Sequence, residues 1–394
     1  MTDKLEPCIL PWVNFCTTPS GRARPCGYSQ DKSAVKIKDS TVAREFNDPL
    51  YREVRREFMA GRWPSNCERC RRMEEGQPGK SKKASERPFF ELYRDLIAKT
   101  AADGSVGHFP KQIDIRLGTI CNLKCIHCGT GNSSKWNEDA ALLGKYPNTE
   151  IIRHDNSWVD RDGELWENIC ERIAEIDKFN FLGGEPFASR QHKRLIERVA
   201  DSGHAQRIML HYVTNGTLLT PAMIATLKKF KQVTLNVSLD AAGKALEFFR
   251  FPIVARELDE KLSWLDAEAT AHFNPAIQWT SSNVSLYYLD QTLDHLAGRF
   301  PNLELKFCNF VDFPAHMSPQ NLPLKIKERI ARKLEFHSSR HKEIPFFLDH
   351  MFAADLWPAQ GPTFIRYLDD LSAARGLRWE EHFPELYGEL HARH

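Results

Sequence analysis

The stretch that decides the fold is QIDIRLGTICNLKCIHC, residues 112–128. Its first part, Gln112–Leu117, alternates polar and apolar residues and predicts a β-strand. The strand runs directly into a loop that carries three cysteines within eight residues. Reactive side chains in a loop at the carboxyl end of a strand are typical of a functional site on an α/β scaffold.

The same alternation of strand and helix continues downstream of this stretch. Further strands are predicted at Lys178–Leu182, Arg207–Thr214, Val233–Leu239, Ala276–Ser281 and Leu303–Phe310. Helices are predicted between them at Gly163–Ile176, Arg190–Ala200, Pro221–Phe230, Ala255–Ala269 and Leu289–Phe300. This order favours right-handed βαβ units and a parallel sheet. Six units would close most of a barrel, so the predicted class is α/β with a partial (β/α)6 barrel.

The barrel pattern divides the chain into three predicted domains. Residues 1–107 form a small cysteine-rich domain with a hairpin in residues 1–30, a helix near Asp48–Ala60 and a turn-rich basic segment from Gly61 to Arg87. Residues 108–314 form the barrel. Residues 315–394 form a helical, polar extension without a chemical motif.

Bulk composition narrows the function classes. The 394 residues carry a net charge of +2, which gives no reason to expect nucleic acid or a membrane surface as a partner. No apolar run reaches the ~20 residues of a membrane span, and the N-terminus does not resemble a secretory signal. The expected compartment is cytoplasmic. Disulfides are disfavoured there, so most of the ten cysteines indicate metal or redox chemistry. The isolated Cys170 and Cys308 are predicted to be small buried hydrophobic residues.

The cysteine loop has the spacing C-x3-C-x2-C at Cys121, Cys125 and Cys128. A structural zinc site normally uses four ligands, and this loop offers three thiolates. Three thiolates on a cuboidal four-iron cluster leave one iron with an open position. An open position is what a catalytic metal site needs.

The loop, together with Gly183-Gly184-Glu185-Pro186 after the second barrel strand, resembles the radical S-adenosylmethionine (SAM) superfamily. The resemblance implies a 4Fe-4S cluster whose open iron is chelated by the amino and carboxylate groups of SAM. It also implies an external electron donor such as flavodoxin or ferredoxin. Reductive cleavage of SAM would give a 5′-deoxyadenosyl radical that takes a hydrogen atom from the substrate.

The resemblance also assigns residues to the SAM pocket. Gly183 and Gly184 permit close approach of the backbone to a ligand, and Glu185 offers a carboxylate to the SAM ammonium. Asn215, Ser238 and Asp240 correspond to positions that hold the ribose hydroxyls or the methionine carboxylate in similar enzymes.

Two further residues of the implied pocket have competing interpretations. Arg250 resembles an arginine near the SAM carboxylate, and a surface ion pair is the alternative. His127 stands where the family usually has an aromatic residue that packs near the adenine, and a half-exposed polar filler is the alternative. Asn215 also has a second interpretation, because Asn-Gly is an ordinary turn.

The N-terminal cysteines form a second set. Cys8, Cys26, Cys67 and Cys70 are enough for one complete cluster or one zinc ion, and spacing alone does not decide between them. The segments CILPW…SGRARPC and NCERC resemble an N-terminal twitch domain, a half-length SPASM domain. That resemblance implies a second, auxiliary 4Fe-4S cluster held by these four residues, with Cys16 as a bystander.

The implied function is hydrogen-atom abstraction from a small-molecule or peptide substrate, in an oxidative modification of natural-product or peptide biosynthesis. Two alternatives remain: an iron–sulfur electron carrier or sensor without its own substrate, and a zinc-stabilised binding protein. The Gly183–Pro186 motif argues against the carrier, because a carrier has no need to bind SAM.

Overall fold

The computed structural model describes residues 5–30, 37, 40–152 and 154–392. The chain divides into two compact units that are discontinuous in sequence. The first unit contains Met1–Gly118, His154–Tyr212 and Ala225–Val233, and the second contains Thr119–Arg153, Val213–Ile224 and Thr234–His394. The division into 1–107, 108–314 and 315–394 stays a prediction.

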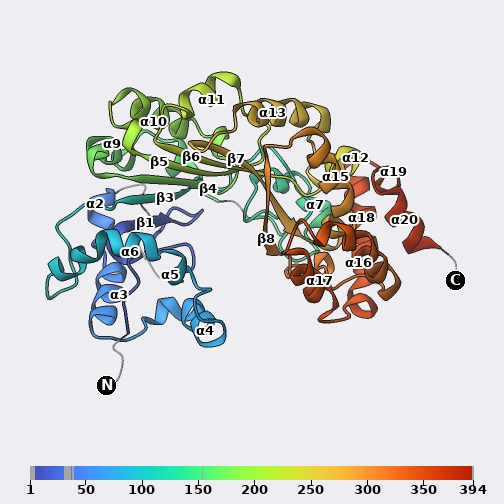
Figure 1. Cartoon of the computed structure of the whole chain (residues 1–394), viewed down its shortest axis with the longest axis horizontal. Coiled ribbons are helices and arrows are strands. Elements are labelled where there is room, and N and C mark those ends of the chain that lie inside the picture. Colours follow the sequence, from blue (N-terminus) through green and yellow to red (C-terminus); the bar gives the residue numbers. More distant parts are fainter. Residues whose placement is uncertain (1–4, 31–36, 38–39, 153, 393–394) are drawn as a thin grey trace. The chain divides into compact units, whose positions relative to one another are not determined.

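The elements alternate as an α/β fold (Figure 1). The strands are β1 (Asn14–Thr17), β2 (Ala23–Arg24), β3 (Gln112–Arg116), β4 (Lys178–Leu182), β5 (Met209–Thr214), β6 (Gln232–Ser238), β7 (Phe273–Ser281) and β8 (Glu304–Phe310). The helices up to β4 are α1 (Leu10–Val13), α2 (Val42–Glu45), α3 (Pro49–Met59), α4 (Glu68–Gly76), α5 (Lys82–Ser85), α6 (Arg87–Tyr93), α7 (Ala140–Leu143), α8 (Ser157–Asp160) and α9 (Glu164–Glu171). All six predicted barrel strands are present.

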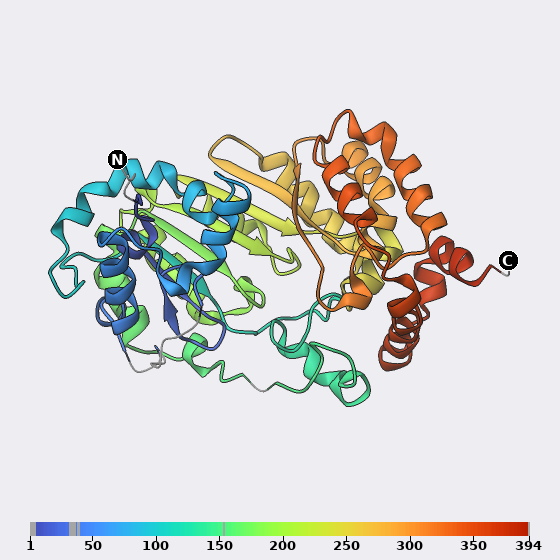
Figure 2. The ribbon, with the colours of Figure 1, turned by 90° about the horizontal axis from the view of Figure 1, so that it is seen from below.

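The later helices include the predicted C-terminal helical region. They are α10 (Arg190–Asp201), α11 (Pro221–Leu227), α12 (Gly243–Phe249), α13 (Ala255–Glu268), α14 (Asn283–Tyr287), α15 (Leu289–Arg299), α16 (Leu324–Ser338), α17 (Ile344–Phe352), α18 (Trp357–Arg375), α19 (Trp379–His382) and α20 (Pro384–His391). Figure 2 shows the orange and red helices α16 to α20 gathered together within the second unit. Among the described residues, no helix has the length and apolar character needed to cross a membrane.

The sheet of the first unit has the strand order β2-β1-β3-β4-β5. β1 and β2 form the predicted antiparallel hairpin, and β1 also pairs parallel with β3. The hairpin is thereby part of the sheet of the first unit. The reason is burial: all four residues of β1 are buried, so β1 behaves as an interior strand.

The two faces of this sheet differ in polarity. Phe15, Ile113, Phe179 and Leu210 are paired in register across β1, β3, β4 and β5, and each is at most 2% exposed. This apolar face lies toward α10, since the Phe181 ring is 4.6 Å from the His192 ring. Helix α10 begins at a capping residue, Ser189, whose hydroxyl accepts from the backbone N–H of His192.

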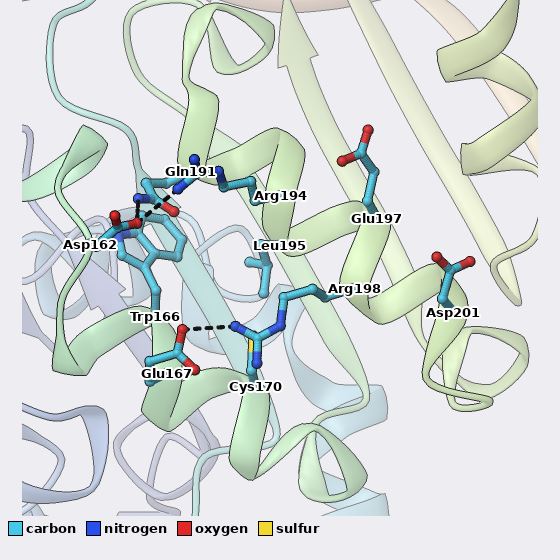
Figure 3. Close-up of a pocket in the computed structure, with 10 residues that line it drawn as sticks. All are labelled: Asp162, Trp166, Glu167, Cys170, Gln191, Arg194, Leu195, Glu197, Arg198 and Asp201. Carbon is cyan, nitrogen blue, oxygen red and sulfur yellow. Dashed lines mark hydrogen bonds and ion pairs between the residues drawn. The ribbon is translucent and has the colours of Figure 1, made fainter.

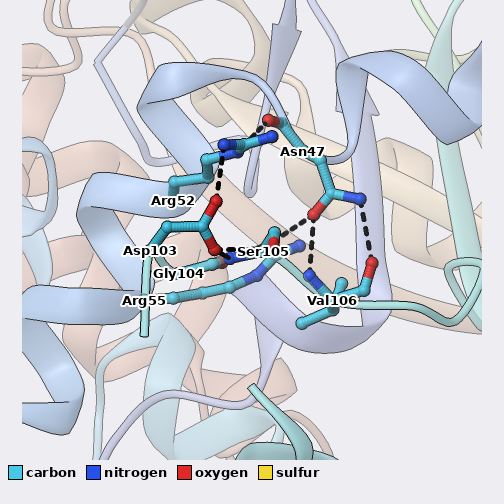
Figure 4. Close-up of polar contacts among 7 residues, drawn as sticks. All are labelled: Asn47, Arg52, Arg55, Asp103, Gly104, Ser105 and Val106. Atoms are coloured by element: carbon cyan, nitrogen blue, oxygen red, sulfur yellow. Dashed lines mark hydrogen bonds and ion pairs between the residues drawn. The ribbon is translucent and has the colours of Figure 1, made fainter. Parts of the chain in front are cut away.

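Within the first unit, Arg55 of helix α3 holds several segments of the N-terminal region together (Figure 4). The Arg55 side chain is fully buried and donates to the carbonyl oxygens of Pro11, Phe46 and Gly104 at 2.8, 2.8 and 3.2 Å. Asn47 completes the network, because its amide exchanges two hydrogen bonds with the backbone of Val106, each 2.9 Å long. These bonds satisfy a buried charge with backbone carbonyls from three separate segments.

The segment from Gly61 to Arg87 is more helical than predicted, because it contains α4 and α5. Glu68 stabilises the first turn of α4 by pairing with Arg71 and Arg72, each at 2.9 Å. The sequence interpretation counted these arginines as a solvated basic run and overlooked the helical spacing of the pairs. Cys308 is exposed on β8 rather than buried, and Cys170 is half-buried.

In the second unit the strand order is β6-β7-β8. β7 and β8 are parallel, with Trp279 opposite Phe307, and their rings lie 5.4 Å apart. Trp279 also packs at 5.4 Å against Phe347 of α17. This aromatic cluster anchors the C-terminal helices to the last strand pair.

Candidate functional site

Cys121, Cys125 and Cys128 lie in one loop of the second unit, which follows β3 in the chain. Cys125 is buried, whereas Cys121 and Cys128 are half-buried. Burial raises the pKa of the Cys125 thiol to about 11, and the Arg250 guanidinium acts against this shift. The pKa of the Cys128 thiol is also raised, first by burial and then by Cys125 and Cys121. Each of the three thiols thus lies near enough to another for its charge to be felt.

The backbone of this loop is held by residues from several distant segments. The Lys124 and Ile126 N–H groups donate to the carbonyl oxygens of Phe251 and Phe249 at 2.6 and 2.8 Å. The Trp136 indole donates to the Cys125 carbonyl at 3.1 Å, and the Ser133 hydroxyl donates to the Leu123 carbonyl at 2.6 Å. These hydrogen bonds hold the loop backbone in one conformation.

Asn215 joins the end of β5 to this loop. Its Nδ2 donates to Asn122 Oδ1 at 2.8 Å and lies 4.0 Å from Cys121 Sγ. Its Oδ1 accepts from the N–H and hydroxyl of Thr217, and Thr217 Oγ1 accepts from Asn122 Nδ2 at 2.8 Å. Asn215 is thus more than an ordinary turn residue, because it closes a hydrogen-bonded ring beside a cysteine. The participation of Asn122 was missed from the sequence.

Asp240 and Arg250 form a buried ion pair next to Cys125. Arg250 Nη2 lies 2.5 Å from Asp240 Oδ2, and Arg250 Nη1 donates to Cys125 Sγ at 3.7 Å. The side chains are 7% and 0% exposed, so this is not the surface pair considered above. Asp240 Oδ1 and Arg250 Nε are buried and find no hydrogen-bond partner among the residues described. Ser238 is half-buried at the end of β6.

His127 packs against Phe249, with ring centroids 5.1 Å apart and a tilt of 45°. Burial lowers the pKa of His127, so the ring is neutral at neutral pH. Its Nδ1 is buried and has no hydrogen-bond partner in the described part of the chain. The ring is therefore a planar, uncharged group beside the cysteine loop.

The Gly183–Pro186 motif lies at the end of β4 in the first unit. Gly183 and Gly184 have φ angles of +81° and +49°, which favour glycine. A Cβ on Gly183 would also lie 3.2 Å from the carbonyl oxygen of Gly118. Glu185 is 1% exposed, and its Oε1 accepts from the backbone N–H of Phe187 at 3.1 Å. This local bond fixes the orientation of the carboxylate.

Aromatic residues support the Glu185 turn from behind. Phe187 stacks on Tyr212 at 5.0 Å, and the Tyr212 hydroxyl lies 2.9 Å from His192 Nε2. Burial lowers the pKa of His192 to about 3, so this imidazole is neutral. No local sequence pattern predicts that Phe187, Tyr212 and His192 pack together, because they come from three different elements of the chain.

The four N-terminal cysteines line one pocket in the first unit. Its walls include Cys8, Cys26, Cys67 and Cys70, together with Lys82, Lys83, Phe58 and Trp63. Burial raises the pKa of the Cys8 thiol, and the neighbouring Cys26 raises it further. The pKa of Cys67 is raised to about 12, again first by burial and then by Cys26 and Cys70. Cys16 lies on β1 and does not line this pocket.

The donor chemistry of both cysteine sets fits iron–sulfur ligation, since thiols gather at each place. Within the residues described, however, no group of three or more His, Cys, Asp and Glu side chains is arranged to hold a single metal ion.

A row of polar side chains crosses the other face of the first unit's sheet. Cys16, Asp114, Asn180 and His211 are paired in register, and Arg24 lies opposite Cys16. Buried atoms of this face, namely Arg24 Nε, Asp114 Oδ1 and Arg116 Nε, have no hydrogen-bond partner among the described residues. A polar face of this kind suits a polar ligand, and no motif in the sequence predicted it.

A separate surface pocket lies between α9 and α10 (Figure 3). Its charged walls are neutralised in pairs: Arg194 lies 2.9 Å from Asp162, and Arg198 lies 2.8 Å from Glu167. None of the predicted site residues lines it. Paired surface charges of this kind are typical of a solvated helix face.

Comparison with known proteins finds a family similarity over part of the chain. Residues 115–274 match the model of the radical SAM superfamily. The radical SAM cyclopropyl synthase TigE of Paramaledivibacter caminithermalis is 27% identical over 158 residues. The aligned part covers 39% of this chain and 32% of TigE, so the chain matches about a third of the length of that relative.

Two solved structures have weak overall similarity. Streptococcus suis SuiB bound to the precursor peptide SuiA gives a TM-score of 0.41 at 14% identity, over 65% of this chain and 52% of that chain. Native anSMEcpe with bound AdoMet gives a TM-score of 0.37 at 18% identity, over 51% of each chain.

Proposed function

We propose that this chain is a radical SAM enzyme and that it holds a 4Fe-4S cluster with Cys121, Cys125 and Cys128, which lie within the matched residues 115–274. With SAM bound at that cluster, the cofactor supplies a 5′-deoxyadenosyl radical that removes a hydrogen atom from a small-molecule or peptide substrate. The observation that carries the proposal is the cysteine loop: three neighbouring thiols, within the matched region, on a backbone already held in one conformation.

The residues around the loop have proposed roles in binding SAM. Arg250 and Asp240 lie beside Cys125 with unused polar atoms, which supports a role at the methionine carboxylate and its surroundings. His127 offers a neutral planar ring for the adenine. Ser238 and Asn215 are proposed to contact the ribose or carboxylate, with Asn215 also orienting Cys121.

Glu185, with Gly183 and Gly184, is proposed to bind the SAM ammonium. The buried carboxylate is oriented by the Phe187 N–H, and a carboxylate forms strong charge-assisted hydrogen bonds with an ammonium group. The two glycines allow the backbone to turn there without a side chain in the way.

The N-terminal pocket is proposed to hold an auxiliary 4Fe-4S cluster in a twitch domain. Cys8, Cys26, Cys67 and Cys70 supply four thiolates around one pocket, which supports a cluster with every iron ligated by protein. Such a cluster suits electron transfer, so the proposed outcome is an oxidative modification of a natural product or peptide. An external flavodoxin or ferredoxin is the proposed electron donor, and the cytoplasm is the proposed compartment because the cysteines must remain reduced.

The test of the main proposal is reductive SAM cleavage. The chain is reconstituted with iron and sulfide without oxygen, and 5′-deoxyadenosine is measured after addition of SAM and dithionite. Replacement of Cys121, Cys125 and Cys128 together by Ala should abolish 5′-deoxyadenosine formation. Cys308→Ala, at an exposed cysteine outside both sets, is the matched control and should behave as wild type. Product from the triple variant would refute the proposal, and bound zinc in place of iron would favour a binding protein.

A further inference from the structure

Helix α18 brings the C-terminal region, which shows no motif in the sequence, to the cysteine loop. Tyr367 is buried and its hydroxyl donates to the Ile126 carbonyl at 2.7 Å. Ile126 directly follows Cys125. The loop backbone is therefore fixed between two cysteines by a residue 241 positions further along the chain.

A second contact from α18 passes through a buried carboxylate. Arg375 Nε lies 3.0 Å from Asp139 Oδ2, and Lys124 Nζ lies 2.5 Å from Asp139 Oδ1. Lys124 directly precedes Cys125. The side chains of Arg375, Asp139 and Lys124 are 0%, 3% and 8% exposed. Arg375 and Tyr367 thus reach the residues on both sides of Cys125.

This buried triad carries more positive than negative charge. Two cations share one buried carboxylate, and the remaining acid, Glu138, is 3.4 Å from Lys124 but half exposed to water. The Arg375 guanidinium packs over the rings of Trp136 and Phe251, at 5.0 and 5.4 Å. Its Nη1 and Nη2 are buried and have no hydrogen-bond partner among the described residues.

Stability alone does not account for this arrangement. A buried charge with unsatisfied donors costs free energy, and an apolar side chain of similar size would serve the fold as well or better. The two aromatic residues beneath Arg375 are themselves bonded to the loop, through the Trp136 indole and the Phe251 carbonyl. The charge is therefore held in a fixed place beside the loop, in surroundings of low dielectric.

We infer that α18 belongs to the cluster site, with Tyr367 and Arg375 as positioning residues for the cysteine loop and Arg375 as the charge that raises the reduction potential of its cluster. The inference rests on the proposed function, since it needs a cluster at Cys121, Cys125 and Cys128. A fixed positive charge favours the reduced cluster, which carries one more electron.

The test is a redox titration of the reconstituted full-length chain without SAM, followed by electron paramagnetic resonance of the reduced cluster. Arg375→Met should shift the midpoint potential of this cluster to a more negative value, and Arg375→Lys should restore most of the shift. Asp139→Asn, which removes the buried negative charge, should shift it in the opposite direction. Arg366→Met, at an exposed arginine of the same helix, is the matched control and should leave the potential unchanged.

If Arg375 and Asp139 had a purely structural role, the direction of the shift in midpoint potential would not depend on the sign of the charge that is removed. Equal potentials for wild type and Arg375→Met, or equal shifts for the Lys and Met variants, would overturn the electrostatic part. Arg375→Met is expected to fold, because Asp139 and Lys124 remain as a balanced pair.

The positioning part is tested by Tyr367→Phe, which removes only the hydroxyl. The variant should lose iron to a chelator about three- to tenfold faster, the factor that one hydrogen bond is worth. An unchanged rate of loss would refute that part. If the wild-type chain itself binds no cluster at the three cysteines, the proposed function fails; if it does and the variants match it, only this inference fails.

Discussion

The two cysteine sets of this chain are built in different ways. In the first unit, Cys8, Cys26, Cys67 and Cys70 come from three separate segments and meet at one pocket lined by apolar side chains and two lysines. In the second unit, Cys121, Cys125 and Cys128 come from one short loop, flanked by a buried ion pair, a neutral imidazole and an amide network. The four-thiol set is self-sufficient as a ligand set, whereas the three-thiol set is incomplete and surrounded by polar groups that can serve a cofactor.

This comparison predicts different consequences for loss of each set. The Cys67→Ala/Cys70→Ala variant should lower the iron content from about eight to about four per chain, because one complete cluster is lost. SAM cleavage should persist, so with a deuterated substrate deuterium should still reach 5′-deoxyadenosine, while the oxidised product disappears. Iron analysis and mass spectrometry measure both. Normal product at the normal rate would make the N-terminal set structural.

The buried ion pair of the second set should have a large effect on stability. Arg250→Met leaves Asp240 as a buried charge without its partner, and we expect a loss of about 3–5 kcal/mol in the free energy of unfolding. Urea denaturation measures it. Arg250→Met/Asp240→Asn should recover much of the loss, because the unpaired charge is gone. Arg256→Met, at an exposed arginine in α13, should change little. No recovery in the double variant would mean that packing, not charge, dominates.

A variant of Glu185 sharpens the comparison, because it tests the proposed role of this residue in binding SAM without changing either cysteine set. Glu185→Gln keeps an oxygen acceptor for the Phe187 N–H but removes the charge. A charge-assisted hydrogen bond is worth about 1.5–3 kcal/mol, so SAM affinity should fall by about ten- to a hundredfold. Equilibrium binding of SAM measures this, while cluster absorbance should be unchanged. Glu197→Gln, on the exposed face of α10, is the control. Unchanged affinity would exclude Glu185 from the pocket.

The sequence predicted those parts of the fold whose signal is local. The strands from β3 to β8 follow short apolar runs, and the cysteine loop and the glycine turn are contiguous motifs. Two local predictions were wrong: Cys308 is exposed because β8 is mostly uncovered, and the Gly61–Arg87 segment is helical because its charges pair along α4.

The parts that could not be predicted depend on contacts between distant residues. Arg375 meets Asp139 across 236 positions, and Tyr367 meets Ile126 across 241. In the sequence, each is an ordinary charged or aromatic residue of an amphipathic helix. The pairing of β1 with β3 is likewise set by tertiary packing rather than by a pattern within β1. The assigned roles of Glu185, Ser238 and the N-terminal cysteines stay predictions.

The smallest expected effect concerns His192, which supports the Glu185 turn in the first unit. The pKa of His192 in the folded chain is about 3, well below the ordinary histidine value near 6.5, because burial disfavours the charged ring. As the pH falls below about 6.5, the unfolded chain binds a proton at this position and the folded chain does not. The contribution of His192 to stability is therefore complete above about pH 6.5 and declines as the pH falls toward 3.

Between pH 7.0 and 5.5 this decline should amount to about 1 kcal/mol in the free energy of unfolding, measured by urea denaturation at both values. His192→Gln has no titrating ring and should show a pH dependence that is weaker by that amount. His272→Gln, at an exposed histidine, is the matched control and should retain the wild-type dependence. If the His192 and His272 variants lose stability equally between the two pH values, His192 is not buried as a neutral ring, and the aromatic support of the Glu185 turn is arranged differently.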